Sequence, residues 1–275
     1  MGAVTLGPLV FDAERLAAML GIGTFLGVAS AMSWRLGPEL ATWSWRALLI
    51  GLVGARLGHV LVHWPSFVQE PLRALAFWQG GFFAGPGLLL AGLTLFVFLP
   101  SAPLRWSSVA PFAAGLLVWS MAWQLTAAVD ARGLPDQSFA TLRGESYRFD
   151  ASGPPLVVNL WASWCPPCRR EMPMMAEVAA SAPHARFVFA NQGESRDKVA
   201  GFLSAERLEM DTVLIDTLGQ ISFHYETPGL PATLFINPDG TLRDVHLGEI
   251  SREVLVEKIA RIAVPREGVP IADVE

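Results

Sequence analysis

The chain has 275 residues, of which 52% are hydrophobic and only 16% are charged, and its formal net charge is −5. About a quarter of the residues in soluble globular domains are charged, so this composition excludes a wholly soluble protein of ordinary make-up. The acidic balance also leaves no basic patch, so no nucleic-acid partner is expected.

The charged residues are distributed unevenly along the chain. Residues 1–129 carry six arginines, four acids, no lysine and eight of the ten tryptophans. The remaining residues carry 35 of the 45 charged side chains. This division predicts a transmembrane helical domain over residues 1–130, a soluble domain over residues 131–265 and a C-terminal tail over residues 266–275.

Four apolar stretches in the first half are long enough to be membrane spans, which need about 17–25 helical residues. Tryptophans lie at or near their ends, as in the aromatic belts of membrane proteins. The alternative, a bundle of buried soluble helices, lacks the polar residues that would form its outer surface. We therefore expect an all-α membrane domain of about four transmembrane helices, with both termini on one side of the membrane. The expected spans are Leu16–Trp34, Ala47–Trp64, Phe82–Leu99 and Ser108–Val129.

One arginine interrupts the second apolar stretch. A charge in the middle of a span is costly unless it is paired or hydrated, so Arg56 is a candidate functional residue. His59 and His63 follow at i+3 and i+7, on the same helical face. The alternative is that this face only pairs inside the helical bundle.

The surrounding residues resemble a known family. Leu48–Val60 (LLIGLVGARLGHV) and Phe77–Gly81 (FWQGG) are similar to the N-terminal part of prolipoprotein diacylglyceryl transferases, over roughly residues 5–100. That family carries a histidine after the Gly-Gly pair, whereas Phe82–Gly87 contains none. We therefore expect a truncated, reused membrane anchor in contact with lipid, with Arg56 and His59 as its candidate residues. A redox-regulated lipid or acyl transferase is the alternative.

A short linker is expected at residues 130–136, and strands and helices then alternate. This order predicts an α/β sheet flanked by helices, with a buried central strand. The expected strands are Leu156–Leu160, Arg186–Ala190, Val213–Ile215, Thr233–Ile236 and Leu242–Leu247. The expected helices are Pro166–Ala180, Arg196–Glu206 and Ser251–Ile262.

The two cysteines of the chain, Cys165 and Cys168, lie where the central strand passes into a helix. Unpaired N–H groups and the macrodipole at a helix N-terminus stabilise a thiolate, and Pro166 suits the first helical turn. This placement predicts that Cys165 attacks a substrate disulfide and that Cys168 resolves the mixed disulfide. A zinc site usually has four protein ligands, and neither a second cysteine pair nor spaced histidines are present, so no metal is expected.

The segments Leu156–Pro173 (LVVNLWASWCPPCRREMP) and Gly229–Gly240 (GLPATLFINPDG) resemble the TlpA/ResA group of bacterial thiol:disulfide reductases. The resemblance extends from about Pro135 to Ile262. It implies a thioredoxin fold that faces the periplasm from the bacterial inner membrane, with the Cys165–Cys168 disulfide in place of any cofactor. The implied partners are extracytoplasmic protein thiols and disulfides and a membrane electron donor of the DsbD type.

The resemblance also gives roles to single residues. Pro231 matches the family's cis-proline, and Glu171 matches an acidic residue that exchanges a proton with Cys168, although Glu171 could instead be an exposed helix carboxylate. Asn159 stands where thioredoxins carry a buried aspartate. The residues expected to contact substrate are Trp164, Pro166, Leu230 and Pro231.

One residue departs from a related branch of the family. Ala232 follows Pro231, where the cytochrome c maturation branch tends to have glutamate, so a dedicated role in apocytochrome c reduction is disfavoured. Reduction or isomerisation is favoured over net oxidation, because no histidine lies between the cysteines as it does in strong periplasmic oxidases. A carrier that holds a metal through its two thiols is the remaining alternative.

Overall fold

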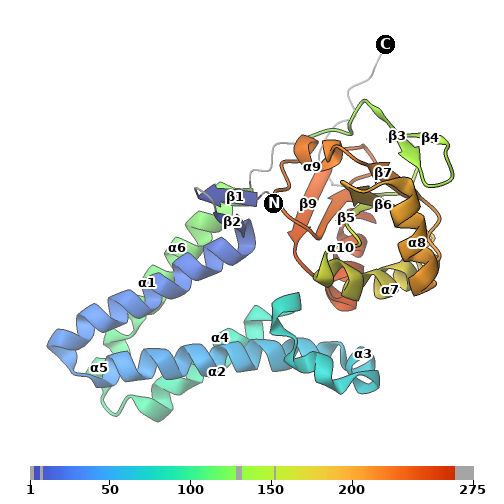
Figure 1. Cartoon of the computed structure of the whole chain (residues 1–275). Coiled ribbons are helices and arrows are strands. Elements are labelled where there is room, and N and C mark those ends of the chain that lie inside the picture. Colours follow the sequence, from blue (N-terminus) through green and yellow to red (C-terminus); the bar gives the residue numbers. More distant parts are fainter. Residues whose placement is uncertain (1–2, 7–8, 128–131, 152, 264–275) are drawn as a thin grey trace. The chain divides into compact units, whose positions relative to one another are not determined.

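The computed structural model describes residues 3–6, 9–127, 132–151 and 153–263. Internal contacts divide the chain into two compact units, Met1–Ala128 and Val129–Glu275 (Figure 1). The expected C-terminal tail, residues 266–275, lies outside the described residues, as do residues 130 and 131 of the expected linker.

The first unit is helical except for an antiparallel hairpin at its start. The hairpin strands are β1 (Ala3–Leu6) and β2 (Leu9–Asp12). The helices are α1 (Ala13–Leu36), α2 (Glu39–Val62), α3 (Trp64–Gln69), α4 (Ala84–Phe98), α5 (Ala102–Ser107) and α6 (Val109–Ala127). Two short 3-10 helices, η1 (Pro71–Leu75) and η2 (Phe77–Gln79), connect α3 to α4.

Small residues allow the helices of this unit to approach closely. Helix α1 packs on α6, and α2 packs on α4. A Cβ atom on Gly21 would lie 3.0 Å from the carbonyl oxygen of Gly115, and one on Gly87 would lie 2.8 Å from that of Gly51. Such contacts between small residues are typical of helix packing in membranes, where apolar surface alone gives no drive for association.

Three of the four expected spans are long and apolar enough to cross a membrane: Arg15–Leu36, Glu39–Val62 and Ala102–Leu125. The expected third span is shorter than predicted, because α4 has only 15 residues. At about 1.5 Å per residue α4 is roughly 22 Å long, which is less than the roughly 30 Å of a bilayer core. Phe82 and Phe83 precede α4 in non-helical backbone, and Leu99 ends it in extended backbone before Pro100.

The second unit is built on a mixed seven-stranded sheet in the order β4-β3-β7-β6-β5-β8-β9. Strands β5, β6 and β7 are parallel, and the neighbouring pairs outside them are antiparallel. The strands are β3 (Ser138–Thr141), β4 (Ser146–Arg148), β5 (Leu156–Trp161), β6 (Arg186–Gln192), β7 (Val213–Asp216), β8 (Ala232–Ile236) and β9 (Leu242–Leu247). The helices are α7 (Pro166–Ser181), α8 (Arg196–Glu206), α9 (Gln220–His224) and α10 (Arg252–Ala263).

The central strand β5 is buried on both faces, which explains its nearly continuous apolar sequence. Val157 and Trp161 pack with α7, α8 and α10, whereas Val158 and Leu160 pack with the buried side of α9. Alternate residues of a strand face opposite sides, so Asn159 faces the α7 layer. This sheet with helices on both faces is the expected thioredoxin fold.

The sequence prediction missed three elements of this unit: β3, β4 and α9. They have only three to five residues each. The remaining elements agree with the prediction to within one or two residues at each end.

Candidate functional site

Cys165 and Cys168 form a disulfide at the start of α7. Cys165 is the N-cap residue of the helix, and the backbone N–H of Cys168 donates to its sulfur at 3.3 Å. Both cysteines are buried. When the disulfide is reduced, the same N–H group and the helix dipole would stabilise a thiolate on Cys165 rather than on Cys168.

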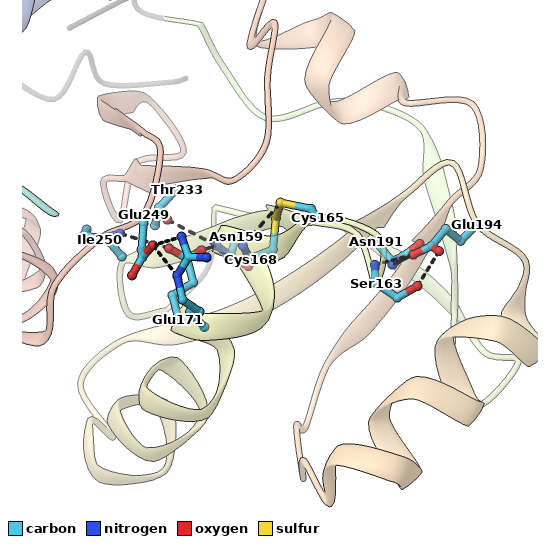
Figure 2. Close-up of a disulfide and its surroundings, with 11 residues drawn as sticks. Asn159, Ser163, Cys165, Cys168, Glu171, Asn191, Glu194, Thr233, Glu249 and Ile250 are labelled. Atoms are coloured by element: carbon cyan, nitrogen blue, oxygen red, sulfur yellow. Dashed lines mark hydrogen bonds and ion pairs between the residues drawn. A yellow bond between two sulfur atoms is a disulfide. The ribbon is translucent and has the colours of Figure 1, made fainter. Parts of the chain in front are cut away.

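Glu171 lies one turn after Cys168 on α7 and is buried, with 2% of its surface exposed. The alternative of an exposed helix carboxylate is therefore wrong. Its carboxylate accepts hydrogen bonds from the side-chain amide of Asn159 and from the backbone N–H of Ile250, both at 3.0 Å (Figure 2). Burial raises the pKa of Glu171 to about 8, against the lowering effect of these two hydrogen bonds. The carboxyl group can therefore hold or release a proton near neutral pH.

The loop after β9 connects Glu171 to the expected proline. The Leu230–Pro231 peptide bond is cis, and the carbonyl of Pro231 accepts a hydrogen bond of 2.8 Å from Gly248 N–H. Two residues further on, Ile250 donates to Glu171. Leu230 packs against the cluster of buried residues that contains both cysteines. One short loop thus contacts both the cis-proline segment and the acidic residue of α7.

An open groove of about 410 Å³ lies beside Cys165. The groove includes two of the residues expected to contact substrate, Trp164 and Pro166, but neither Leu230 nor Pro231. Its lining residues are Ser163, Trp164, Pro166, Arg169, Arg170 and Glu206. Trp164 is 63% exposed, so it offers apolar surface to an incoming chain.

A second polar network holds the loop that precedes Cys165 (Figure 2). The buried carboxylate of Glu194 accepts from the backbone N–H of Ser163 at 2.7 Å and from its hydroxyl at 2.6 Å. Asn191 and Lys198 bind the same carboxylate, each at 2.8 Å. Burial raises the pKa of Glu194, but these hydrogen bonds together lower it to about 2. The carboxylate is therefore ionised at every physiological pH and fixes the loop two residues before Cys165.

The candidate residues of the first unit form a different kind of site. Each of the five N–H donor positions of the Arg56 guanidinium is directed at a backbone carbonyl, as an arginine fork allows. The acceptors are Arg73, Ala74, Ala76, Gly80 and Gly81, at 2.6–3.3 Å. Gly81 has a φ of +81°, and a Cβ atom there would lie 2.6 Å from Nε2 of His59. The residues resembling the transferase therefore include Arg56 and part of a folded connection, residues 70–81, which Arg56 holds in place.

Comparison with known proteins finds a family model that matches each unit. Residues 128–245 match the AhpC/TSA family, and residues 3–123 match prolipoprotein diacylglyceryl transferase. The thioredoxin-like protein YneN of Bacillus subtilis is 33% identical over 142 residues, which are 46% of this chain and 75% of the relative. The chain belongs to the thioredoxin-like thiol–disulfide oxidoreductases.

Two further relatives are named as thiol–disulfide oxidoreductase or interchange proteins, which supports this membership. The thiol-disulfide oxidoreductase ResA of Geobacillus kaustophilus is 31% identical, over 43% of this chain and 70% of the relative. A thiol:disulfide interchange protein DsbE homolog of Paracoccus denitrificans is 32% identical, over 55% of this chain and 88% of the relative. The oxidoreductase domain is thus joined to an N-terminal unit similar to a transferase, as the two resemblances predict.

The prediction from sequence missed the Glu194 network and the backbone donor Ile250. A signal existed for Glu194, because it follows the carboxyl end of β6, which pairs in parallel with β5. Loops at the carboxyl ends of adjacent parallel strands lie side by side, so Glu194 was placed to meet the loop after β5. No comparable signal existed for Ile250, since its contribution comes from the backbone of a loop.

Proposed function

We propose that this oxidoreductase reduces disulfides in extracytoplasmic proteins, with Cys165 as nucleophile and Cys168 as resolving thiol. The Cys165 thiolate attacks a substrate disulfide, forms a mixed disulfide and releases one substrate thiolate. The Cys168 thiolate then attacks the Cys165 sulfur, and the second substrate thiolate leaves. The enzyme ends as the disulfide, and the substrate has gained two electrons and two protons, so no diffusible cofactor takes part.

The observation that carries this proposal is the hydrogen bond from Cys168 N–H to the Cys165 sulfur at the helix N-terminus. That contact favours Cys165 as the thiolate that attacks and later departs. Glu171 has the second role, that of proton acceptor. Its carboxyl group, with a pKa of about 8, can accept the proton of the Cys168 thiol when Cys168 attacks the mixed disulfide. Trp164, Pro166, Leu230 and the cis-Pro231 segment are proposed to contact the substrate chain.

The first unit is proposed to anchor the enzyme in the bacterial inner membrane, with the oxidoreductase domain in the periplasm. Most of the side chains in its apolar helices are at least partly exposed, which suits contact with lipid. A membrane electron donor of the DsbD type would return the enzyme to its dithiol form. Transferase activity is not proposed, because the donor positions of Arg56 are directed at backbone carbonyls rather than toward a lipid headgroup.

The redox potential of the Cys165–Cys168 couple tests the direction of electron flow. Equilibration of the full chain with glutathione in detergent should give a potential below about −200 mV, on the reducing side of the range of known thioredoxin-fold proteins. A value above about −150 mV, close to that of a strong periplasmic oxidant, would show that the enzyme oxidises its substrates instead.

A further inference from the structure

Two large apolar side chains of the second unit are left in solvent. Leu218 is 82% exposed and Phe223 is 86% exposed. The other large apolar side chains that are exposed in the described part of this unit are Trp164, beside the disulfide, and Val256, which is 50% exposed. Leu218 and Phe223 are therefore its most exposed large apolar residues, and no part of the proposed redox chemistry uses them.

The two residues lie on either side of the first turn of α9. The N-cap residue of α9 is Gly219, so Leu218 precedes the cap and Phe223 is the fourth helical residue. These are the two positions whose side chains approach each other in a hydrophobic staple. The opposite side of the same short helix packs in the core of the domain, where Ile221 and Tyr225 are buried. We call Leu218 and Phe223 the α9 edge.

The chain enters the second unit next to this helix. Arg132 donates to the carbonyl of His224 at 2.9 Å and forms an ion pair of 2.6 Å with Glu226. The carbonyl of Gly133 accepts from Tyr225, and a ring nitrogen of His224 lies 2.9 Å from it. Arg132 and Gly133, the first described residues of the second unit, are thus bound to the C-terminal end of α9.

The connection between the last membrane helix and this end of α9 is short. Helix α6, which forms most of the apolar span Ala102–Leu125, ends at Ala127, five residues before Arg132. Five residues reach at most about 18 Å. A domain of this size is roughly 35 Å across, so the connection reaches at most about half a domain diameter.

We propose that the α9 edge is a membrane-contact surface, with Leu218 and Phe223 entering the interfacial layer of the phospholipid bilayer. Apolar and aromatic side chains next to a membrane anchor gain from leaving water for that layer. Helices α9 and α7 pack on opposite faces of the sheet, so lipid on the α9 edge leaves α7 and its cysteines available to substrate proteins. The inference rests on membrane anchoring and is independent of the direction of the redox reaction.

Site-specific photocrosslinking tests the proposal in the full chain. Benzoylphenylalanine replaces Leu218, Phe223 or, as the matched control, Val256, in protein reconstituted into phosphatidylethanolamine–phosphatidylglycerol vesicles. Retained disulfide exchange by Cys165 and Cys168 confirms that each variant is folded.

After illumination, lipid adducts are measured by mass spectrometry. Positions 218 and 223 should give about tenfold more lipid adduct than position 256, as expected of side chains inserted in the interface. Equal yields at the three positions would overturn the proposal. Adducts at 218 and 223 to another protein or to a second copy of the chain would overturn it too, and would identify a protein interface instead.

Discussion

The side-chain amide of Asn159 in β5 donates a hydrogen bond of 3.0 Å to the carboxylate of Glu171 in α7. The same amide lies 3.3 Å from the hydroxyl oxygen of Thr233, the residue that pairs with Asn159 across β5 and β8. The acidic residue is therefore held from the central strand on one side and from Ile250 on the other. Asparagine supports the carboxyl group without adding the second buried charge that an aspartate would bring.

Replacement of Glu171 by Gln should change the pH dependence of the resolving step. Below pH 8 the carboxyl group is mostly protonated and cannot accept the Cys168 proton, so the wild-type rate should rise as pH increases through about 8. In Glu171→Gln this rise should be lost and resolution should be about tenfold slower or more. Stopped-flow decay of a preformed mixed disulfide measures the rate.

The control for this variant is Glu177→Gln, which removes an exposed carboxylate from the same helix. It should leave the profile unchanged. A Glu171→Gln profile identical to that of the wild type would show that Glu171 takes no part in proton transfer.

The same variant should also alter stability. Burial raises the folded pKa of Glu171 from 4.5 to about 8, so its contribution to the free energy of unfolding is full below pH 4.5 and is lost as pH rises through about 8. Glu171→Gln should remove this loss between pH 4.5 and 8. Denaturant unfolding at both ends of that range measures it, and an undiminished loss of stability in the variant would assign the effect to other groups.

Glu194→Gln should loosen the attachment of the loop before Cys165 and lower the stability of the domain. The substitution removes the charge that binds Lys198, and its amide group cannot accept all the hydrogen bonds from Ser163 and Asn191, so stability should fall by about 1–3 kcal/mol. Since its folded pKa of about 2 is below 4.5, the Glu194 contribution is full above pH 4.5 and is lost as pH falls toward 2.

The control is Glu206→Gln, which breaks a largely exposed ion pair with Arg169. Such pairs contribute about 0–1 kcal/mol, so this variant should change stability little. Equal effects of the two substitutions in thermal unfolding would mean that Glu194 does not fix the loop.

Arg56 should tolerate neither Gln nor Lys. The structure uses all five donor positions of a planar guanidinium, and lysine supplies only three donors in another geometry. In both variants the free energy of unfolding should fall by about 2–4 kcal/mol, and residues 70–81 should become susceptible to protease cleavage in detergent. Arg105→Gln, which removes a hydrogen bond of 2.9 Å to the carbonyl of Leu99, is the milder control. A stable Arg56→Lys variant would indicate that the charge, and hence a lipid headgroup, is what this position requires.

The sequence predicted most of the second unit because its signals were local. A buried strand, a Cys-Pro-Pro-Cys helix start and the Asn-Pro-Asp-Gly turn each determine structure within a few residues. The networks around Glu171 and Glu194 were less accessible, because their partners Ile250 and Ser163 lie 79 and 31 residues away and contribute backbone N–H groups. The expected third span was too long, since the hydropathy of Phe82–Leu99 does not show that helix α4 begins only at Ala84.

Reporter fusions should place the oxidoreductase domain in the periplasm. Fusions after residue 131 and at Ser101 should report opposite sides, because the span Ala102–Leu125 separates them. A third fusion at the N-terminus distinguishes four spans, with both ends in the periplasm, from three spans, with the N-terminus in the cytoplasm. A cytoplasmic signal after residue 131 would contradict the proposed location and substrates.

The most direct test of the central claim is trapping of mixed disulfides by single-cysteine variants of the full chain. If Cys165 attacks and Cys168 resolves, Cys168→Ser should accumulate substrate adducts that dithiothreitol releases, and Cys165→Ser should trap few. Non-reducing gels followed by mass spectrometry of the adducts give the result. Equal trapping by the two variants, or preferential trapping by Cys165→Ser, would contradict the account.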